Sequence, residues 1–158
     1  MRRIFSAVGI ALLALSLTGC GAGFNATTRT YTQVTDGAEA TLRTDGNNLR
    51  AVNLLIIAAG QGTGVLIGTI VNAADTEDTL LAVAINGTVM AYTGKNSLPK
   101  NSPIIFEGPS SNARAVITGF GAEPGTNVEL TMFFARAGEV TRTIIVRDNT
   151  LEYSSITP

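Results

Sequence analysis

The chain contains no histidine and no tryptophan, and Cys20 is its only cysteine. Histidine is the commonest general base and metal ligand near neutral pH, so its absence removes both roles at once. A single cysteine cannot close a disulfide within the chain. These absences exclude most histidine-dependent hydrolases, most zinc sites and the small disulfide-stabilised scaffolds.

Charged residues are scarce as well. They make up 15% of the 158 residues, against roughly 25% in an average globular domain. The formal net charge is −1, and it becomes −3 when Arg2 and Arg3 are removed with a leader peptide. Because no basic block is present, we expect no nucleic-acid partner. The hydrophobic content of 45% is too high for a disordered chain, and the length allows one globular domain.

Residues 1–19 have the pattern of a secretory signal peptide. Arg2 and Arg3 precede the apolar run Ile4–Leu17, which is too short to cross a hydrocarbon core of roughly 30 Å as a helix. The run leads into Leu17-Thr18-Gly19-Cys20, and this motif resembles the lipobox of bacterial lipoproteins. The resemblance implies that the chain is cleaved before Cys20 and that Cys20 carries a diacylglyceryl group and fatty acids such as palmitate.

We therefore expect Cys20 to hold the protein on the extracytoplasmic face of the cell membrane, since two or more acyl chains give stable anchoring. A secreted protein with a free cysteine and an uncleaved anchor helix are the alternatives. Residues 20–47 are rich in glycine, threonine, asparagine and alanine, and they predict a flexible linker. Within this linker, Thr27–Val34 alternates in the manner of an early strand.

Residues 48–148 predict an all-β domain, which a tail over residues 149–158 follows. Apolar and β-branched runs are separated by glycine, asparagine, aspartate and proline clusters, without a helical period. Asn86-Gly87 is a strong hairpin signal, because both residues tolerate a positive φ. About eight short strands of this kind predict a Greek-key β-sandwich or barrel. The expected strands are Leu49–Ala58, Gly64–Asn72, Leu80–Ile85, Thr88–Tyr92, Pro103–Phe106, Ala113–Thr118, Asn127–Ala135 and Glu139–Val146. In the seventh strand the side chains expected to face the core are Val128, Leu130, Met132 and Phe134.

Two loops contain residues that suggest ligand binding. The segment Gly60–Gly64 resembles a phosphate-binding loop, but a strand follows it instead of a helix, and it lacks the lysine and hydroxyl pair. It therefore predicts a turn. Asp75, Glu77 and Asp78 place three carboxylates within four residues, without the spacing of a calcium-binding loop. They predict a solvated hairpin turn.

The remaining reactive groups do not form a catalytic or soft-metal set. Lys95 and Lys100 lie in a segment rich in proline, asparagine and serine, which predicts an exposed loop and disfavours a serine–lysine hydrolase. Met90 and Met132 alone cannot supply the three or four ligands of a soft-metal site. We therefore expect no catalytic residue, no metal site and no cofactor.

The β region resembles a known family. The segment Gly125–Gly138 has an alternating strand that ends on phenylalanine, followed by an Ala-Gly turn, and it is similar to the last hairpin of periplasmic copper chaperones of the PCu(A)C type. Upstream, Ile70-Val71-Asn72 is similar to the strand of that family that carries a buried asparagine. The start Cys20-Gly21-Ala22-Gly23 is similar to that of actinobacterial LpqE-type lipoproteins within it. The resemblance implies a cupredoxin-like Greek-key sandwich.

The copper ligands of this family do not carry over. Its late His-x-Met motif falls on Arg114-Ala115-Val116, and its earlier ligand pair falls near Met90. A guanidinium group cannot bind a cation, and valine has no donor atom. We therefore expect the fold without its metal site. Arg114, at the rim of the domain, is a candidate recognition residue, and a plain surface arginine is the alternative.

These observations predict a non-enzymatic binding or interaction module of the cell envelope. One partner is the membrane, through the lipid on Cys20, and the other is an envelope protein. The alternative is a copper- or other metal-handling envelope protein that uses backbone, carboxylate or partner-supplied ligands.

Overall fold

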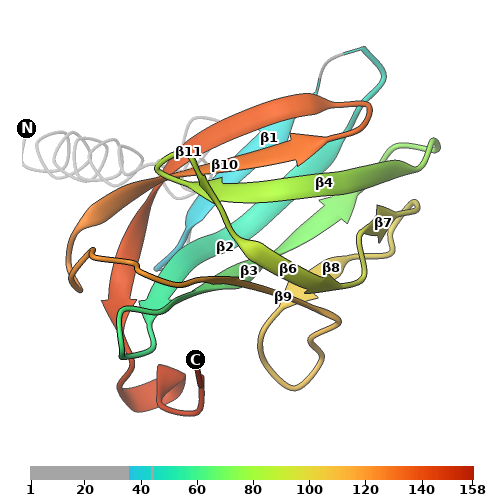
Figure 1. The fold of residues 1–158 in the computed structure, drawn as a ribbon. Coiled ribbons are helices and arrows are strands. Elements are labelled where there is room, and N and C mark those ends of the chain that lie inside the picture. Colours follow the sequence, from blue (N-terminus) through green and yellow to red (C-terminus); the bar gives the residue numbers. More distant parts are fainter. Residues whose placement is uncertain (1–35, 44) are drawn as a thin grey trace, which may run out of the picture. The chain divides into compact units, whose positions relative to one another are not determined.

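The computed structural model describes residues 36–43 and 45–158, which form eleven strands and one short 3-10 turn (Figure 1). The described residues contain no α-helix. The elements are β1 (Ala38–Leu42), β2 (Leu49–Ala58), β3 (Gly64–Asn72), β4 (Asp78–Ile85), β5 (Thr88–Val89), β6 (Ala91–Gly94), β7 (Ser97–Leu98), β8 (Ile104–Phe106), β9 (Ala113–Ile117), β10 (Asn127–Phe134), β11 (Gly138–Asp148) and η2 (Leu151–Tyr153).

The strands form one strongly curved sheet in the order β5-β4-β10-β11-β2-β3-β8-β9-β6. The two ends of this order, β5 and β6, are separated in the chain by Met90 alone, so the sheet is nearly closed into a barrel. Off this path, β1 pairs with β2 and β7 pairs with β4. The all-β class is therefore confirmed, with eleven strands in place of about eight.

Two layers of the sheet enclose the main core. In Figure 1 the layer of β4, β10 and β11 lies over the layer of β2, β3, β8 and β9. Alternate side chains of β10 point into the space between them, as predicted, because successive side chains of a strand point to opposite faces. Val128, Leu130, Met132 and Phe134 are all buried in this core.

Two turns agree with their sequence signals. Asn86 and Gly87 have φ values of 47° and 79°, and they connect β4 to β5 as a tight hairpin turn. The glycine-rich segment 60–64 turns the chain from β2 into β3, with Gly60 and Gly62 at φ values of 88° and 67°. No helix follows it, so it has no helix N-terminus for a phosphate.

The folded part begins earlier in the chain than predicted. The sequence predicts a flexible linker over residues 20–47, yet β1 lies inside this range and pairs with β2 through Ala40↔Ala51 and Leu42↔Leu49. The prediction missed β1 because its five residues include two alanines, which have a low preference for strands. The predicted signal peptide, Cys20 and the possible strand Thr27–Val34 lie outside the described residues.

One predicted strand, Thr88–Tyr92, is divided in two. It is interrupted at Met90, whose side chain is buried and whose backbone N–H donates to the oxygen of Val83 at 2.8 Å. The residues before the interruption continue the β4 layer as β5, and those after it pair with β9 as β6. The strand therefore changes layers at Met90.

The C-terminal segment, residues 149–158, packs on the outer side of the sheet. Asn149 Nδ2 donates to the oxygen of Ile156 at 2.8 Å and closes the segment on itself. Ile156 and Tyr153 belong to a second apolar cluster, which we call the outer cluster. Its members are Leu55, Ile57, Ala59, Val65 and Ile156, with Ile67, Val116, Ile145 and Tyr153 packed against them. This second cluster explains why β2 contains an unbroken apolar run, since the run is buried on both faces.

Among residues 36–43 and 45–158, no helix is both long enough and apolar enough to cross a membrane.

Candidate functional site

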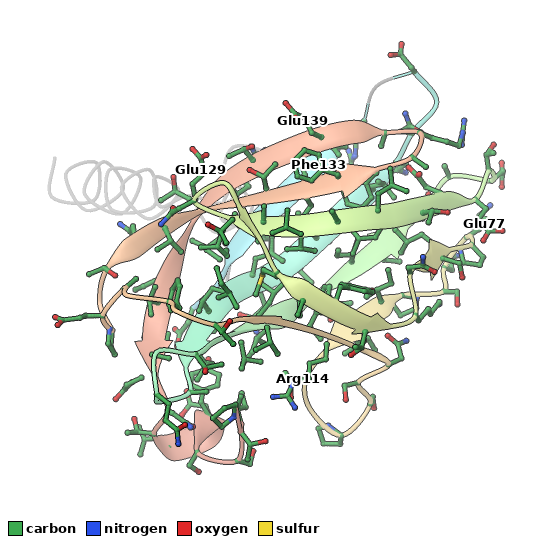
Figure 2. The ribbon with its side chains drawn as sticks, in the orientation of Figure 1. Glu77, Arg114, Glu129, Phe133 and Glu139 are labelled. Carbon is green, nitrogen blue, oxygen red and sulfur yellow. The ribbon has the colours of Figure 1, made fainter. Side chains whose placement is uncertain are left out.

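Arg114 and Val116, onto which the predicted resemblance places the copper motif, lie on the outer face of β9. Arg114 pairs with Thr93 of β6, and Val116 pairs with Ala91. The alternating residue Ala115 is buried in the main core, so Arg114 and Val116 point away from it. Figure 2 shows Arg114 below β9, on the side of the domain away from Glu129.

Arg114 is held by contacts within the domain. Its Nε lies 3.3 Å from Oε1 of Glu107, and its Nη2 donates a hydrogen bond to the backbone oxygen of Thr157. The side chain of Arg114 is 35% exposed and that of Glu107 is 18% exposed, so the pair is partly screened from water. The candidate recognition residue therefore joins β9 to the loop after β8 and to the C-terminal segment.

Val116 and Met90 do not complete a metal site with Arg114. Val116 packs in the outer cluster with Ile156, whereas Met90 is buried in the main core on the other side of the sheet. The sequence motif thus maps onto positions that do not converge. Within residues 36–43 and 45–158, no group of three or more histidine, cysteine, aspartate or glutamate side chains is placed to hold a metal ion.

A hollow of about 390 Å³ lies between the C-terminal segment and the loop after β8. Its lining combines the apolar side chains of Ile67, Pro109 and Ile156 with polar groups that include Glu107 and Tyr153. Burial, together with the negative charges of Asp36 and Glu152, raises the pKa of the Tyr153 phenol, so it stays protonated at neutral pH. The hollow offers carboxylates and a neutral phenol, without an amine or imidazole to act as a base.

The prediction that Asp78 lies in a solvated turn is wrong, because its side chain is buried. It is 3% exposed and belongs to β4. Its Oδ1 accepts the backbone N–H groups of Thr79 at 2.7 Å and Arg136 at 2.9 Å, and its Oδ2 accepts that of Ala137 at 3.0 Å. Because Arg136 and Ala137 form the turn between β10 and β11, the Asp78 carboxylate fastens that hairpin to β4. This aspartate is structural.

Asp75, from the same predicted turn as Asp78, is solvent-exposed as predicted. Its Oδ1 lies 2.5 Å from Nζ of Lys100. The hydrogen bond and the positive charge of Lys100 lower the pKa of the Asp75 carboxyl. The side chains of Asp75 and Lys100 are 90% and 50% exposed, so water and salt screen the pair.

Asn72 occupies the position of the buried asparagine in the predicted resemblance. It is 1% exposed at the end of β3. Its Nδ2 donates to the backbone oxygens of Thr76 and Leu98, each at 2.8 Å, and its Oδ1 accepts the N–H of Ala74 at 2.9 Å. A buried amide with these partners closes the loop after β3 and ties it to β7. Asn72 is therefore also structural.

Lys95 is more buried than the predicted exposed loop implies, because β6 and β7 form on either side of it. Its Nζ lies 2.6 Å from Oγ of Ser102, 3.0 Å from the backbone oxygen of Ser102 and 3.2 Å from that of Pro103. An ammonium group has three N–H donors, and these three oxygens match them. The lysine therefore holds the loop before β8 through contacts with Ser102 and Pro103.

A tyrosine supports the same loop from the core side. The Tyr92 hydroxyl donates to the backbone oxygen of Lys95, and its ring meets that of Phe106 edge to face, with centroids 6.0 Å apart. Burial raises the pKa of the Tyr92 phenol to about 12, so it remains a hydrogen-bond donor across the physiological range. Tyr92, Lys95 and Ser102 thus form a structural group.

Neither the protein-family models nor the curated proteins include a match to this sequence. Solved structures do match, over 70% of the chain. The fold is PCuAC-like. The copper-bound PCuAC domain from PmoF2 gives a TM-score of 0.56 at 21% identity, with 98% of that domain covered. The apo PCuAC domain from PmoF1 gives 0.55 at 24% identity with 99% covered, and the apo PmoF2 PCuAC domain gives 0.51 at 19% with 94% covered.

These likenesses confirm the part of the sequence prediction that concerns the fold. Within this fold, the side chains of Arg114 and Val116 on β9 both make contacts with the C-terminal segment. The apolar residues Tyr153 and Ile156 hint that the C-terminal segment packs on the domain. The sequence does not show that the surface they cover includes β9.

Proposed function

We propose that this protein is a lipid-anchored lipoprotein of the LpqE type, a non-enzymatic binding module of the cell envelope on a PCuAC-like scaffold without the metal site. In this proposal Cys20 carries the lipid and holds the domain on the extracytoplasmic face of the membrane. The partners are the membrane, through this anchor, and an envelope protein. No cofactor and no nucleic acid take part.

One observation carries this proposal. The two positions on β9 where the family motif would place copper ligands hold Arg114 and Val116, and both are engaged with the C-terminal segment. Arg114 bonds to the oxygen of Thr157, and Val116 packs beside Ile156. A copper ion at these two positions would meet a guanidinium, which repels cations, and a valine side chain, which offers no donor atom.

The proposal predicts that the protein does not retain copper. The full-length chain carrying Cys20→Ser, purified in detergent, is titrated with Cu(I) in competition with bicinchoninate and separately with Cu(II). The serine removes the one thiol that would bind Cu(I) outside the domain. We expect no ion to be retained at submicromolar free copper, because the described residues contain no set of soft ligands. Retention of one equivalent would contradict the proposal.

A second function is favoured by the copper bound to one structural neighbour, the PCuAC domain from PmoF2. In that case the chain would handle copper through carboxylates, backbone groups or ligands of a partner. The same titration tests this possibility for the chain alone. Repeating it with the copper-bound PmoF2 domain as donor tests transfer, and a stable copper-bridged complex would favour the second function.

The lipid anchor has its own test. We expect Cys20→Ala to yield protein that keeps its full leader and lacks the mass of the lipid. The matched control Thr18→Ala keeps a small residue in the motif and should still be processed. Intact-mass spectrometry of the membrane and soluble fractions measures both properties. An unchanged mass of the Cys20→Ala protein would contradict the anchor.

A further inference from the structure

One outer face of the sheet carries exposed apolar side chains. Leu81 and Val89 are each 64% exposed, and they are two of the three large apolar residues that stand out in this way among the described residues. Phe133, on β10, is half-buried on the same side of the sheet. None of the three belongs to the main core or to the outer cluster.

The strand register shows that these side chains are neighbours. Phe133 pairs with Ala82 of β4, and a bulge leaves Leu81 as the extra residue beside this pair. Val89 of β5 pairs with Ala84, which pairs in turn with Thr131 of β10. Directly paired residues in antiparallel strands project on the same side of a sheet. The accessible residues of this surface, which we call the β4–β10 face, are Leu81, Ala82, Val89, Glu129, Thr131, Phe133, Glu139, Thr141 and Thr143.

The β4–β10 face is large enough to receive a strand or a helix. Four strands at a spacing of about 4.8 Å give it a width of roughly 14 Å. Along β10 it extends from Glu129 to Phe133, about 13 Å at the rise of an extended strand. Figure 2 shows Glu139 next to Phe133 and Glu129 farther along, all three on the part of the molecule away from Arg114.

The charged groups of the face are all negative. Glu139 pairs directly with Phe133, and Glu129 lies at the other end, opposite Thr143. Neither glutamate forms an ion pair with another described residue. The nearest arginine of β11, Arg142, is turned to the other side of the sheet, where its Nε donates to the oxygen of Glu39 at 3.3 Å. The face therefore combines an apolar centre with uncompensated carboxylates at its margin.

One outer face of the sheet is covered by another part of the chain, and the other is not covered by any described element. On the face of β2, β3 and β9, the C-terminal segment places Tyr153 and Ile156 over the apolar side chains. Over the β4–β10 face no described element packs, since Leu81, Val89 and Phe133 remain exposed or half-exposed. Apolar patches of this kind in soluble domains commonly mark interaction surfaces.

The carboxylates determine which occupant fits. A second copy of the chain would bring Glu129 and Glu139 against each other, and like charges in contact are unfavourable. An anionic bilayer surface would repel the same carboxylates. A protein segment with lysine or arginine beside apolar side chains would pair with both features at once.

We propose that the β4–β10 face is the docking surface for an envelope protein that presents a basic, apolar segment. This inference rests on the proposed binding function and adds the location and the chemistry of the partner. Phe133, Leu81 and Val89 supply the apolar contact, and Glu129 and Glu139 select a cationic segment.

The test is site-specific photocrosslinking of the full-length protein in the cells that produce it. The photoreactive amino acid p-benzoylphenylalanine replaces Phe133 in one strain and Tyr153 in a second. Both are half-exposed aromatic residues, but Tyr153 lies on the covered face, which makes it the matched control. We expect the adduct at position 133 to exceed that at position 153 by about fivefold or more. Peptide mapping should place its partner side in a segment of net positive charge.

Charge reversal then tests the role of the carboxylates. In the position 133 strain, Glu129→Lys with Glu139→Lys should lower the adduct about tenfold, because a cationic segment is then repelled. The control Glu152→Lys, at an exposed residue of the C-terminal segment on the covered face, should leave it unchanged. If the double reversal does not fold, Glu129→Gln with Glu139→Gln should give a smaller loss in the same direction.

Three results would overturn the inference: an adduct at position 133 no stronger than at 153, an adduct made of two copies of this chain, or an adduct that survives charge reversal. Each leaves the copper titration untouched, because that measurement uses the purified chain and does not depend on this face. A chain that binds copper would instead refute the proposed function, whatever the crosslinking shows.

Discussion

Replacing Asp78 by alanine is expected to lower the free energy of unfolding by about 3 kcal/mol. The substitution removes the acceptor for three backbone N–H groups, those of Thr79, Arg136 and Ala137. A buried donor without a partner costs about 1–3 kcal/mol, and part of the cost is recovered where water reaches the turn. Urea unfolding followed by circular dichroism measures the change.

Asp75→Ala is the matched control, because Asp75 lies three residues away and its carboxylate is exposed. We expect it to leave the free energy of unfolding nearly unchanged, since its bond to Lys100 is screened by water. Asp78→Asn should fall between the two, because one carboxylate oxygen is replaced by an NH2 group that faces N–H donors. Equal losses for Asp75→Ala and Asp78→Ala would show that Asp78 does not fasten the hairpin.

Ile156→Ala is expected to lower the free energy of unfolding by about 2–3 kcal/mol, as for other buried aliphatic side chains cut back to alanine. Ile156 is 8% exposed and packs in the outer cluster with Leu55 and Val65. Leu151→Ala, in the same short segment, is the control: Leu151 is 82% exposed, and its truncation should change the free energy of unfolding little. Thermal and urea unfolding of the two variants compare them directly.

A shortened chain that ends at residue 148 extends this test. Without residues 149–158, the apolar side chains of Ile57, Ile67 and Val116 lose their cover. We expect stronger binding of the dye ANS and self-association in sedimentation experiments, because a contiguous apolar surface is then exposed to water. A truncated protein that melts and sediments like the full chain would show that the segment does not stabilise the domain.

The parts of the fold that depend on local pattern were predictable from the sequence. The bounds of β2 and β3 coincide with the predicted strands, because glycine, asparagine and alanine clusters end their apolar runs on both sides. The turn at Asn86-Gly87 was predicted from the tolerance of both residues for positive φ, and both have it. The inward side of β10 followed from its alternation.

The parts that depend on distant partners were not predictable in this way. β1 is held by its pairing with β2, since its own residues give little preference for a strand. The sequence predicts only a tail for the C-terminal segment, because the two apolar residues that dock it, Tyr153 and Ile156, are too few to form a periodic pattern. The sequence wrongly predicts a solvated carboxylate at Asp78, because two of its three N–H partners come from a turn far along the chain.

The same reason limits the candidate site. The identity of Arg114 and Val116 at the motif positions could be read from the sequence, and it predicted that no copper ligand stands there. The contacts of Arg114 with Glu107 and Thr157 could not be read from the sequence, because they require the C-terminal segment to fold back over β9. The alternation of β10 indicated the inward side chains, but the exposed neighbours of Phe133 depend on the register with β4 and on its bulge.

The position of β11 in the sheet constrains the order in which the strands can pair during folding. This last strand lies between β10, which precedes it directly, and β2, one of the first strands, to which Val146 and Asp148 pair in parallel. The barrel therefore cannot close before β11 is available, because β11 joins β10 to a strand from the other end of the domain. Contacts between parts so distant in the sequence form slowly compared with local hairpins such as β2–β3 and β10–β11, so we expect the pairing of β11 with β2 to be a late step in folding.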